Sequence, residues 1–61
     1  MTYNKSVNYV LSNSSIKTES QLRKYAIEIL ENNSLEITNE NIELSIIQLA
    51  EHYQKTVICL N

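Results

Sequence analysis

The sequence predicts an all-α fold, a small three-helix bundle. Three observations lead to this class. The 61 residues include no Gly and no Pro, the residues that punctuate strands and tight turns. Apolar residues recur at helical spacing in three separate stretches, and Asn/Ser-rich pairs such as Asn13-Ser14 and Asn32-Asn33 lie between them. A chain of this length also forms one domain at most, which we take as residues 1–61.

The first helix is predicted over residues 2–11. Its apolar stripe has the spacing i, i+4, i+7 and i+8 and consists of Tyr3, Val7, Val10 and Leu11. Thr2 is the expected N-cap, and the serines and asparagine of residues 12–15 end the helix. Tyr9 falls outside the stripe, so we expect it to be exposed.

The second helix is predicted over residues 18–31. Thr18 and Gln21 fit a capping box, and Glu19 and Arg23 form a favourable i,i+4 pair. Asn32-Asn33 closes the helix, with Asn as the residue expected to accept left-handed backbone angles. The stripe that faces the core consists of Leu22, Tyr25, Ala26, Ile29 and Leu30.

The third helix is predicted over residues 39–56, capped by Thr38 or Asn39. Before it, Leu35 and Ile37 alternate with polar residues, which suggests a short extended segment at 34–38 that fills the core. The C-terminus is left open: the helix stops at Thr56, runs through Leu60, or turns so that residues 57–60 pair with residues 35–37 as strands. The core-facing stripe consists of Ile42, Ile46, Leu49, Ala50 and Tyr53.

Composition excludes several functional classes. One cysteine and one histidine allow neither an intrachain disulfide nor a Cys/His zinc site, and a chain without Gly has no glycine-rich phosphate loop. No Asp is present and the seven Glu are scattered, so we expect no enzyme, no cofactor and no small-molecule substrate. Neither a signal peptide nor an apolar run of membrane-spanning length is recognisable, which favours a cytoplasmic protein.

The leading functional prediction is a small regulator, inhibitor, antirepressor or adaptor that docks an apolar helix face. Leu44, Ile47, Glu51 and Ile58 lie on the side of the third helix away from its core stripe, and Leu60 belongs to an apolar tail. The core of a chain this small is only marginally stable, and association is a usual way to stabilise it. We therefore expect the partner to be another protein or a second copy of the chain, most simply in a homodimer. The abundance of Asn, Ile, Lys and Ser suits a bacterial or phage genome.

The alternative prediction is a helix-turn-helix regulator that reads DNA with the second helix. N-terminal residues of a recognition helix contact bases, and Ser, Gln and Arg are suitable readers. Glu19 and Glu28 beside this patch repel phosphates, and five basic residues are few for duplex binding. The DNA-binding set consists of Lys17, Ser20, Gln21, Arg23 and Lys24, with Ile27 also on the outer side.

Overall fold

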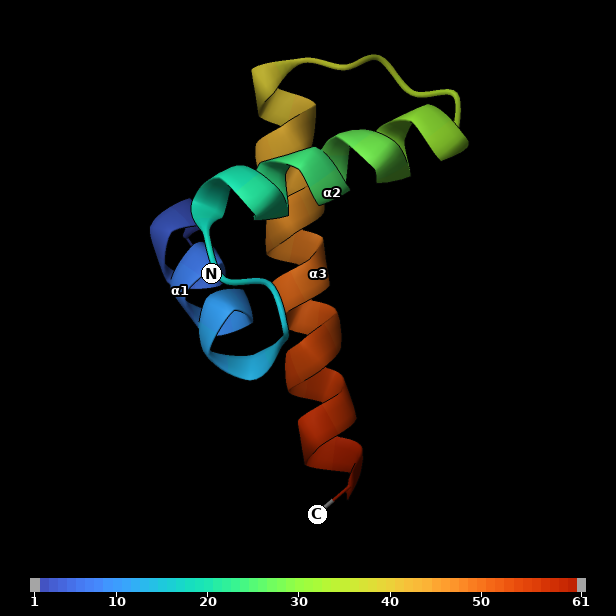
Figure 1. Cartoon of the computed structure of the whole chain (residues 1–61). Coiled ribbons are helices and arrows are strands. Elements are labelled where there is room, and N and C mark those ends of the chain that lie inside the picture. Colours follow the sequence, from blue (N-terminus) through green and yellow to red (C-terminus); the bar gives the residue numbers. More distant parts are fainter. Residues whose placement is uncertain (1, 61) are drawn as a thin grey trace.

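The fold was determined as a computed structural model that describes the backbone of residues 2–60 and the side chains of residues 2–55. It contains three helices: α1 at Tyr3–Asn13, α2 at Glu19–Asn32 and α3 at Asn39–Leu60 (Figure 1). The predicted all-α three-helix bundle is therefore confirmed. Of the three alternatives for the C-terminus, the helix that runs through Leu60 is the one observed.

A threonine caps each helix at its N-terminus. The hydroxyl oxygen of Thr2 accepts a hydrogen bond from the backbone N–H of Lys5 at 3.3 Å, and Thr18 accepts one from Gln21 at 3.2 Å. Thr38 accepts one from Asn41 at 3.1 Å. Each bond satisfies one backbone donor that the first helical turn leaves without a partner, so local sequence fixes where all three helices begin.

Helix α3 is the axis of the molecule. Its 22 residues span about 33 Å, which accounts for the longest dimension of 36 Å. Helix α1 packs against one side of α3, and α2 crosses the N-terminal half of α3 (Figure 1). Helices α1 and α2 have few contacts with each other, so the bundle is held together through α3.

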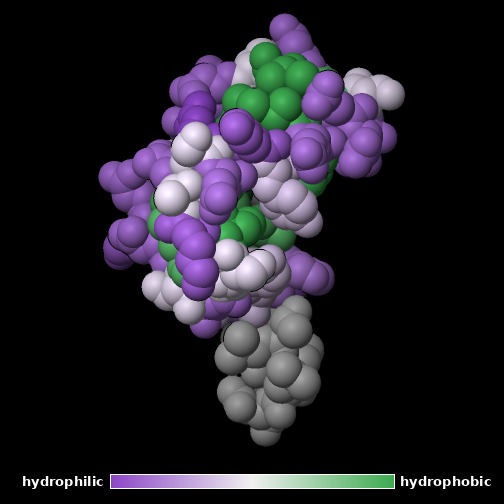
Figure 2. All heavy atoms as spheres, viewed as in Figure 1, coloured by the Kyte–Doolittle hydropathy of each residue, from purple (hydrophilic) through white to green (hydrophobic). Residues whose placement is uncertain are grey.

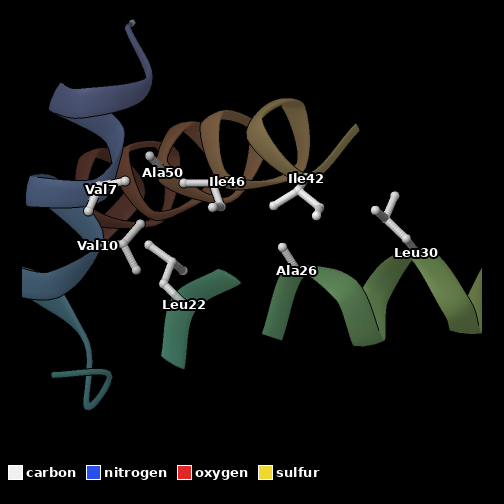
Figure 3. Close-up of a cluster of buried hydrophobic side chains, with 8 residues drawn as sticks. All are labelled: Val7, Val10, Leu22, Ala26, Leu30, Ile42, Ile46 and Ala50. Carbon is white, nitrogen blue, oxygen red and sulfur yellow. The ribbon is translucent and has the colours of Figure 1, made fainter. Parts of the chain in front are cut away.

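The core lies where both shorter helices meet α3 (Figure 3). The only fully buried polar side chain among the described residues is that of Ser6, whose hydroxyl donates to the Thr2 carbonyl oxygen at 2.7 Å. Burial of Ser6 therefore leaves no donor without a partner. The buried apolar side chains are Val7, Val10, Leu22, Ala26, Leu30, Ile42, Ile46 and Ala50.

The loop between α2 and α3 does not fill the core, contrary to the prediction for residues 34–38. Leu35 is 55% exposed and Ile37 is 47% exposed, and no strand occurs within residues 2–60. The reason lies in the backbone, because N–H and carbonyl groups of the loop form hydrogen bonds with the ends of α2 and α3. The Leu35 N–H donates to the Leu30 carbonyl, and the Glu36 carbonyl accepts from the Asn41 amide. These bonds direct the segment along the surface.

Left-handed backbone occurs at Ser34 and not at Asn32 or Asn33. Ser34 has a φ of 56°, whereas Asn33 has a φ of −102°. The Ser34 N–H donates to the Glu31 carbonyl and the Leu35 N–H to the Leu30 carbonyl, the bond pair of a Schellman motif. In this motif the residue after the C-cap is left-handed, and α2 ends one residue later than expected. Because of this shift, the left-handed position is occupied by Ser34 and not by an asparagine.

The side chains at the margin of the core also depart from the predicted stripes. Tyr9 and Ile27, both expected to face outward, are half-buried against the core, while Tyr25 is 43% exposed. Helix α2 crosses α3 instead of lying along it (Figure 1). Such a crossing covers a different set of side chains from the one that a parallel arrangement would cover.

Candidate interaction surfaces

The side of α3 turned away from the core carries the predicted protein interface. Successive helical positions are 100° apart, so Glu40, Leu44, Ile47 and Glu51 fall within about 60° of one another. We call these four residues the outer strip. Leu44 is 54% exposed, Glu40 and Glu51 are exposed, and Ile47 is half-buried because it lies nearest the core edge. The side chains of Ile58 and Leu60 lie outside the described residues.

Two carboxylates flank the apolar part of the outer strip. Glu40 lies one turn before Leu44, and Glu51 lies one turn after Ile47. Glu43 at the strip's flank accepts a hydrogen bond from the Asn39 amide at 3.2 Å. Residues 39–54 of α3 include no Lys or Arg. The first two-thirds of this helix therefore presents an apolar centre with an acidic border.

Large exposed apolar side chains are concentrated next to this helix. Of the four such residues in the described part of the chain, Leu35, Ile37 and Leu44 come from residues 35–44. The face of the molecule in Figure 2 is mostly polar, with apolar surface in two areas, one near the first turns of α3 and one beside α1. Exposed apolar surface that is clustered in this way is typical of a site that another macromolecule covers.

A shallow hollow adjoins the outer strip. Its volume is about 360 Å³, and every residue that lines it belongs to one stretch of α3. A hollow between side chains of a single helix has no opposing wall, so it is an extension of the α3 surface and not a cleft. The residues that line it are Gln48, Glu51, His52, Gln54 and Lys55.

A larger groove lies between the α1–α2 loop, α2 and α3, and the sequence did not predict it. Its volume is about 510 Å³. Ile16, which packs against the core, contributes an apolar side chain, and Tyr25 and Tyr53 contribute aromatic rings. Only one carboxylate, Glu28, lines the groove, so it lacks the carboxylate pair of an acid–base site. The remaining lining residues are Ser14, Ser15, Gln21 and Lys24.

The predicted DNA-binding residues of α2 divide into two groups. Lys17, Ser20, Gln21 and Lys24 are exposed, and the Lys17 N–H donates to the Gln21 side chain at 3.2 Å. Arg23 is half-buried and lies about 100° around the helix from Lys24. Lys17 and Lys24 are therefore both exposed, whereas Arg23 does not belong to the same exposed surface.

Arg23 belongs to a hydrogen-bonded network that joins the beginnings of all three helices. The Tyr3 hydroxyl donates to Glu19 Oε2 at 2.6 Å and accepts from Arg23 Nη1 at 2.9 Å. Arg23 Nη2 donates to Asn39 Oδ1, and the guanidinium carbon lies 5.9 Å from the centre of the Tyr3 ring. Glu19 and Arg23, predicted to pair directly, both bond to the hydroxyl between them.

The network also shifts two pKa values. Burial, followed by the hydrogen bond to Glu19, raises the pKa of Tyr3 above its ordinary value of 10.0. The hydrogen bond to the Tyr3 hydroxyl raises the pKa of Arg23 above its ordinary value. These groups hold the three helix N-termini together and are not free to bind a ligand.

The rest of the described chain offers no second kind of site. Within it, no three His, Cys, Asp or Glu side chains gather closely enough to bind a metal ion. No stretch of that same region combines the length and the hydropathy that a bilayer-spanning helix requires. No protein-family model, curated protein or solved structure matches the sequence or the fold of this chain. Function is therefore inferred from the surfaces of α2 and α3.

Proposed function

We propose that this chain is a small non-enzymatic interaction module that docks the outer strip of α3 on a protein partner. The observation that carries the proposal is the exposure of Leu44, 54% in a helix whose other face contributes Ile42, Ile46 and Ala50 to the core. The half-buried Ile47 one turn away extends the apolar surface. Apolar anchors at i and i+3 with charged residues around them are typical of helix recognition between proteins.

The remaining surfaces favour binding over catalysis. The groove beside Tyr25 has a volume within the range of ligand sites, but it is open and its one carboxylate lies beside a lysine. Acid–base or nucleophilic catalysis needs at least two groups that face each other in a site sheltered from water. A regulator, inhibitor or adaptor requires only a stable helix that presents its side chains.

Site-specific photo-crosslinking tests this proposal. A benzophenone amino acid replaces Leu44 or, in separate variants, Ile47, Gln48 or Asn8, and cells of the native host are irradiated. We expect a discrete protein adduct at positions 44 and 47, and much less at Asn8, an exposed residue of α1. Gln48 reports how sharply contact is limited to the strip. Equal labelling at all four positions, or none, contradicts the proposal.

Duplex DNA binding by α2 is the competing proposal, and the exposed Lys17 and Lys24 are the observation that favours it. Two lysines on this face neutralise few phosphates, and Glu28 lies one turn beyond Lys24. A gel-shift titration with mixed-sequence duplex at low salt decides the question. Binding that is lost in Lys17→Glu/Lys24→Glu but kept in Leu44→Glu would favour DNA over a protein partner.

A further inference from the structure

We infer that the occupant of the outer strip is a basic amphipathic helix of another protein and not a second copy of this chain. This inference rests on the proposed function above, because it names the partner of the same surface. The chemistry that recognises the partner is a pair of apolar anchors between carboxylates. Leu44 and Ile47 form the centre, and Glu40 and Glu51 lie at its two ends.

The charge of the strip defines the charge of the partner. The carboxylates of Glu40 and Glu51 are exposed, and residues 39–54 include no Lys or Arg. Lys55 lies one turn after Glu51, so Glu40 is the carboxylate of the strip that has no basic neighbour on the described part of α3. A partner that covers Leu44 and Ile47 comes within a few ångströms of both carboxylates, because each lies only one helical turn from an anchor. Lys or Arg side chains at the matching positions of the partner would pair with them.

A second copy matches this surface poorly in the registers that pair both anchors or that pair Glu40 with Lys55. Parallel pairing of two α3 helices opposes Glu51 to Glu51 and Glu40 to Glu40. Antiparallel pairing that places Leu44 on Ile47 opposes Glu40 to Glu51 twice. A shift that brings Glu40 to Lys55 places Leu44 against Glu51 and removes the apolar contact. Each register therefore either opposes like charges or exposes the anchors.

The strip also sets the size of the partner. From Glu40 to Glu51 it extends over 12 residues, about 18 Å of helix. A partner helix of similar length, with Leu or Ile at spacings of three and four and Lys or Arg at the flanks, covers both anchors and reaches both carboxylates. A regulator that presents such a face would mask a basic helix, the kind of element that otherwise contacts phosphates or acidic proteins.

The test uses two synthetic 16-residue helical peptides of the same Leu pattern, one with Lys and one with Glu at the polar positions. Each is titrated into the labelled full chain, and backbone amide NMR shifts are followed at about 50 mM and 300 mM salt. We expect the Leu/Lys peptide to shift amides of residues 40–51, with weaker binding at high salt, and the Leu/Glu peptide to cause no shift.

A matched pair of charge variants gives the control. Glu40→Gln/Glu51→Gln removes the strip's two carboxylates, and we expect about tenfold weaker binding of the Leu/Lys peptide, because two rim ion pairs together contribute about that factor. Glu28→Gln/Glu31→Gln removes the same charge from exposed positions of α2 and leaves the affinity within twofold. Equal weakening in both variants means that only net charge matters, and it overturns the inference.

The outcomes separate this inference from the proposed function. Sedimentation from about 10 μM to 1 mM is expected to show a monomer. A dimer that Leu44→Glu dissociates would overturn the basic-partner inference, while protein docking through the outer strip would stand. Shifts confined to the groove, or none with either peptide, would also overturn the inference. The proposed function itself would then be judged by the position dependence of crosslinking at Leu44.

Discussion

At the scale of single residues, Tyr3 and Arg23 determine how the three helices begin relative to one another. Tyr3 opens α1, and its hydroxyl bonds to Glu19 at the start of α2 and to Arg23 one turn later. Arg23 bonds in turn to Asn39, the first residue of α3. The bonded residues on different helices are 16 to 20 positions apart. Sequence spacing therefore predicted only the Glu19–Arg23 pair, which lies within α2.

The Tyr3 hydroxyl makes stability dependent on alkaline pH. Because folding raises the pKa of Tyr3 above 10.0, the contribution of this group is complete below pH 10 and is lost as pH rises through the folded value. We expect the melting temperature to fall above pH 10 and to fall less steeply in Tyr3→Phe. Thermal melts followed by circular dichroism between pH 8 and 11.5 measure both slopes.

The control for this prediction is Tyr25→Phe, which removes a hydroxyl from an exposed tyrosine. Its slope between pH 10 and 11.5 should equal that of the parent chain. If Tyr3→Phe and Tyr25→Phe change the slope by the same amount, the network around Tyr3 is not the cause.

Ser34 is the position where backbone strain is stored. A residue with a side chain at a φ of 56° is destabilised by about 1–2 kcal/mol relative to its usual conformation, a cost that glycine avoids. Glycine also loses more entropy on folding, so we expect Ser34→Gly to stabilise the chain by about 0.5–1 kcal/mol. Urea unfolding measures the change. The exposed Ser15 lacks a positive φ, and Ser15→Gly should give no gain.

At the scale of helices, the sequence predicted what short-range chemistry decides. The three threonine caps, the apolar stripes and the boundaries of α1 and α2 depend on residues within about four positions. The loop at Leu35 and Ile37 was predicted wrongly because its alternation resembles a buried strand, whereas helix-end hydrogen bonds hold it at the surface. Tyr9 and Ile27 depend on the crossing of helices, which periodicity does not encode.

For the candidate sites too, the sequence predicted local features and missed those that depend on residues distant in the chain. Leu44 was predicted to be exposed from helical phase alone, and its 54% exposure confirms that. The groove was not predicted, because it is formed by residues of the α1–α2 loop, α2 and α3 that are distant in sequence. Tyr25 was predicted to face the core, so its exposure beside this groove was not predicted either. Whether either surface binds a partner stays a prediction.

The cap of α2 gives a quantitative test at this scale. Thr18→Ala removes the hydroxyl that accepts from the Gln21 N–H, so the chain should lose about 1 kcal/mol of unfolding free energy. For a domain of this size that corresponds to a decrease of roughly 4–8 °C in melting temperature. Ser20→Ala, an exposed position two residues further on, should change it by less than about 0.5 kcal/mol. Equal losses would show that the cap contributes nothing special.

At the scale of the whole molecule, one face of α3 contributes to the core and the other carries the proposed interface. Eight apolar side chains form the buried core, and α3 contributes Ile42, Ile46 and Ala50 to it. After Ala50 the helix continues for ten residues, about 15 Å, and residues 51–55 include no buried side chain. Tyr53 is the residue of 51–55 that packs against the core margin. A partner that binds the folded chain through α3 would stabilise the fold.

This division predicts opposite behaviour for two neighbouring residues of α3. Ile46→Ala leaves a cavity at the centre of the core and is expected to destabilise the chain by about 2–5 kcal/mol. A bundle of this size has only about 3–5 kcal/mol of net stability, so the variant should lose a large part or all of it and melt far below the parent chain. Leu44→Ala removes an exposed side chain and should leave the melting temperature within about 3 °C. Circular dichroism melts of both variants measure this contrast. If Leu44→Ala were as destabilising as Ile46→Ala, Leu44 would be a core residue of the isolated chain. It would then not be available to contact a partner.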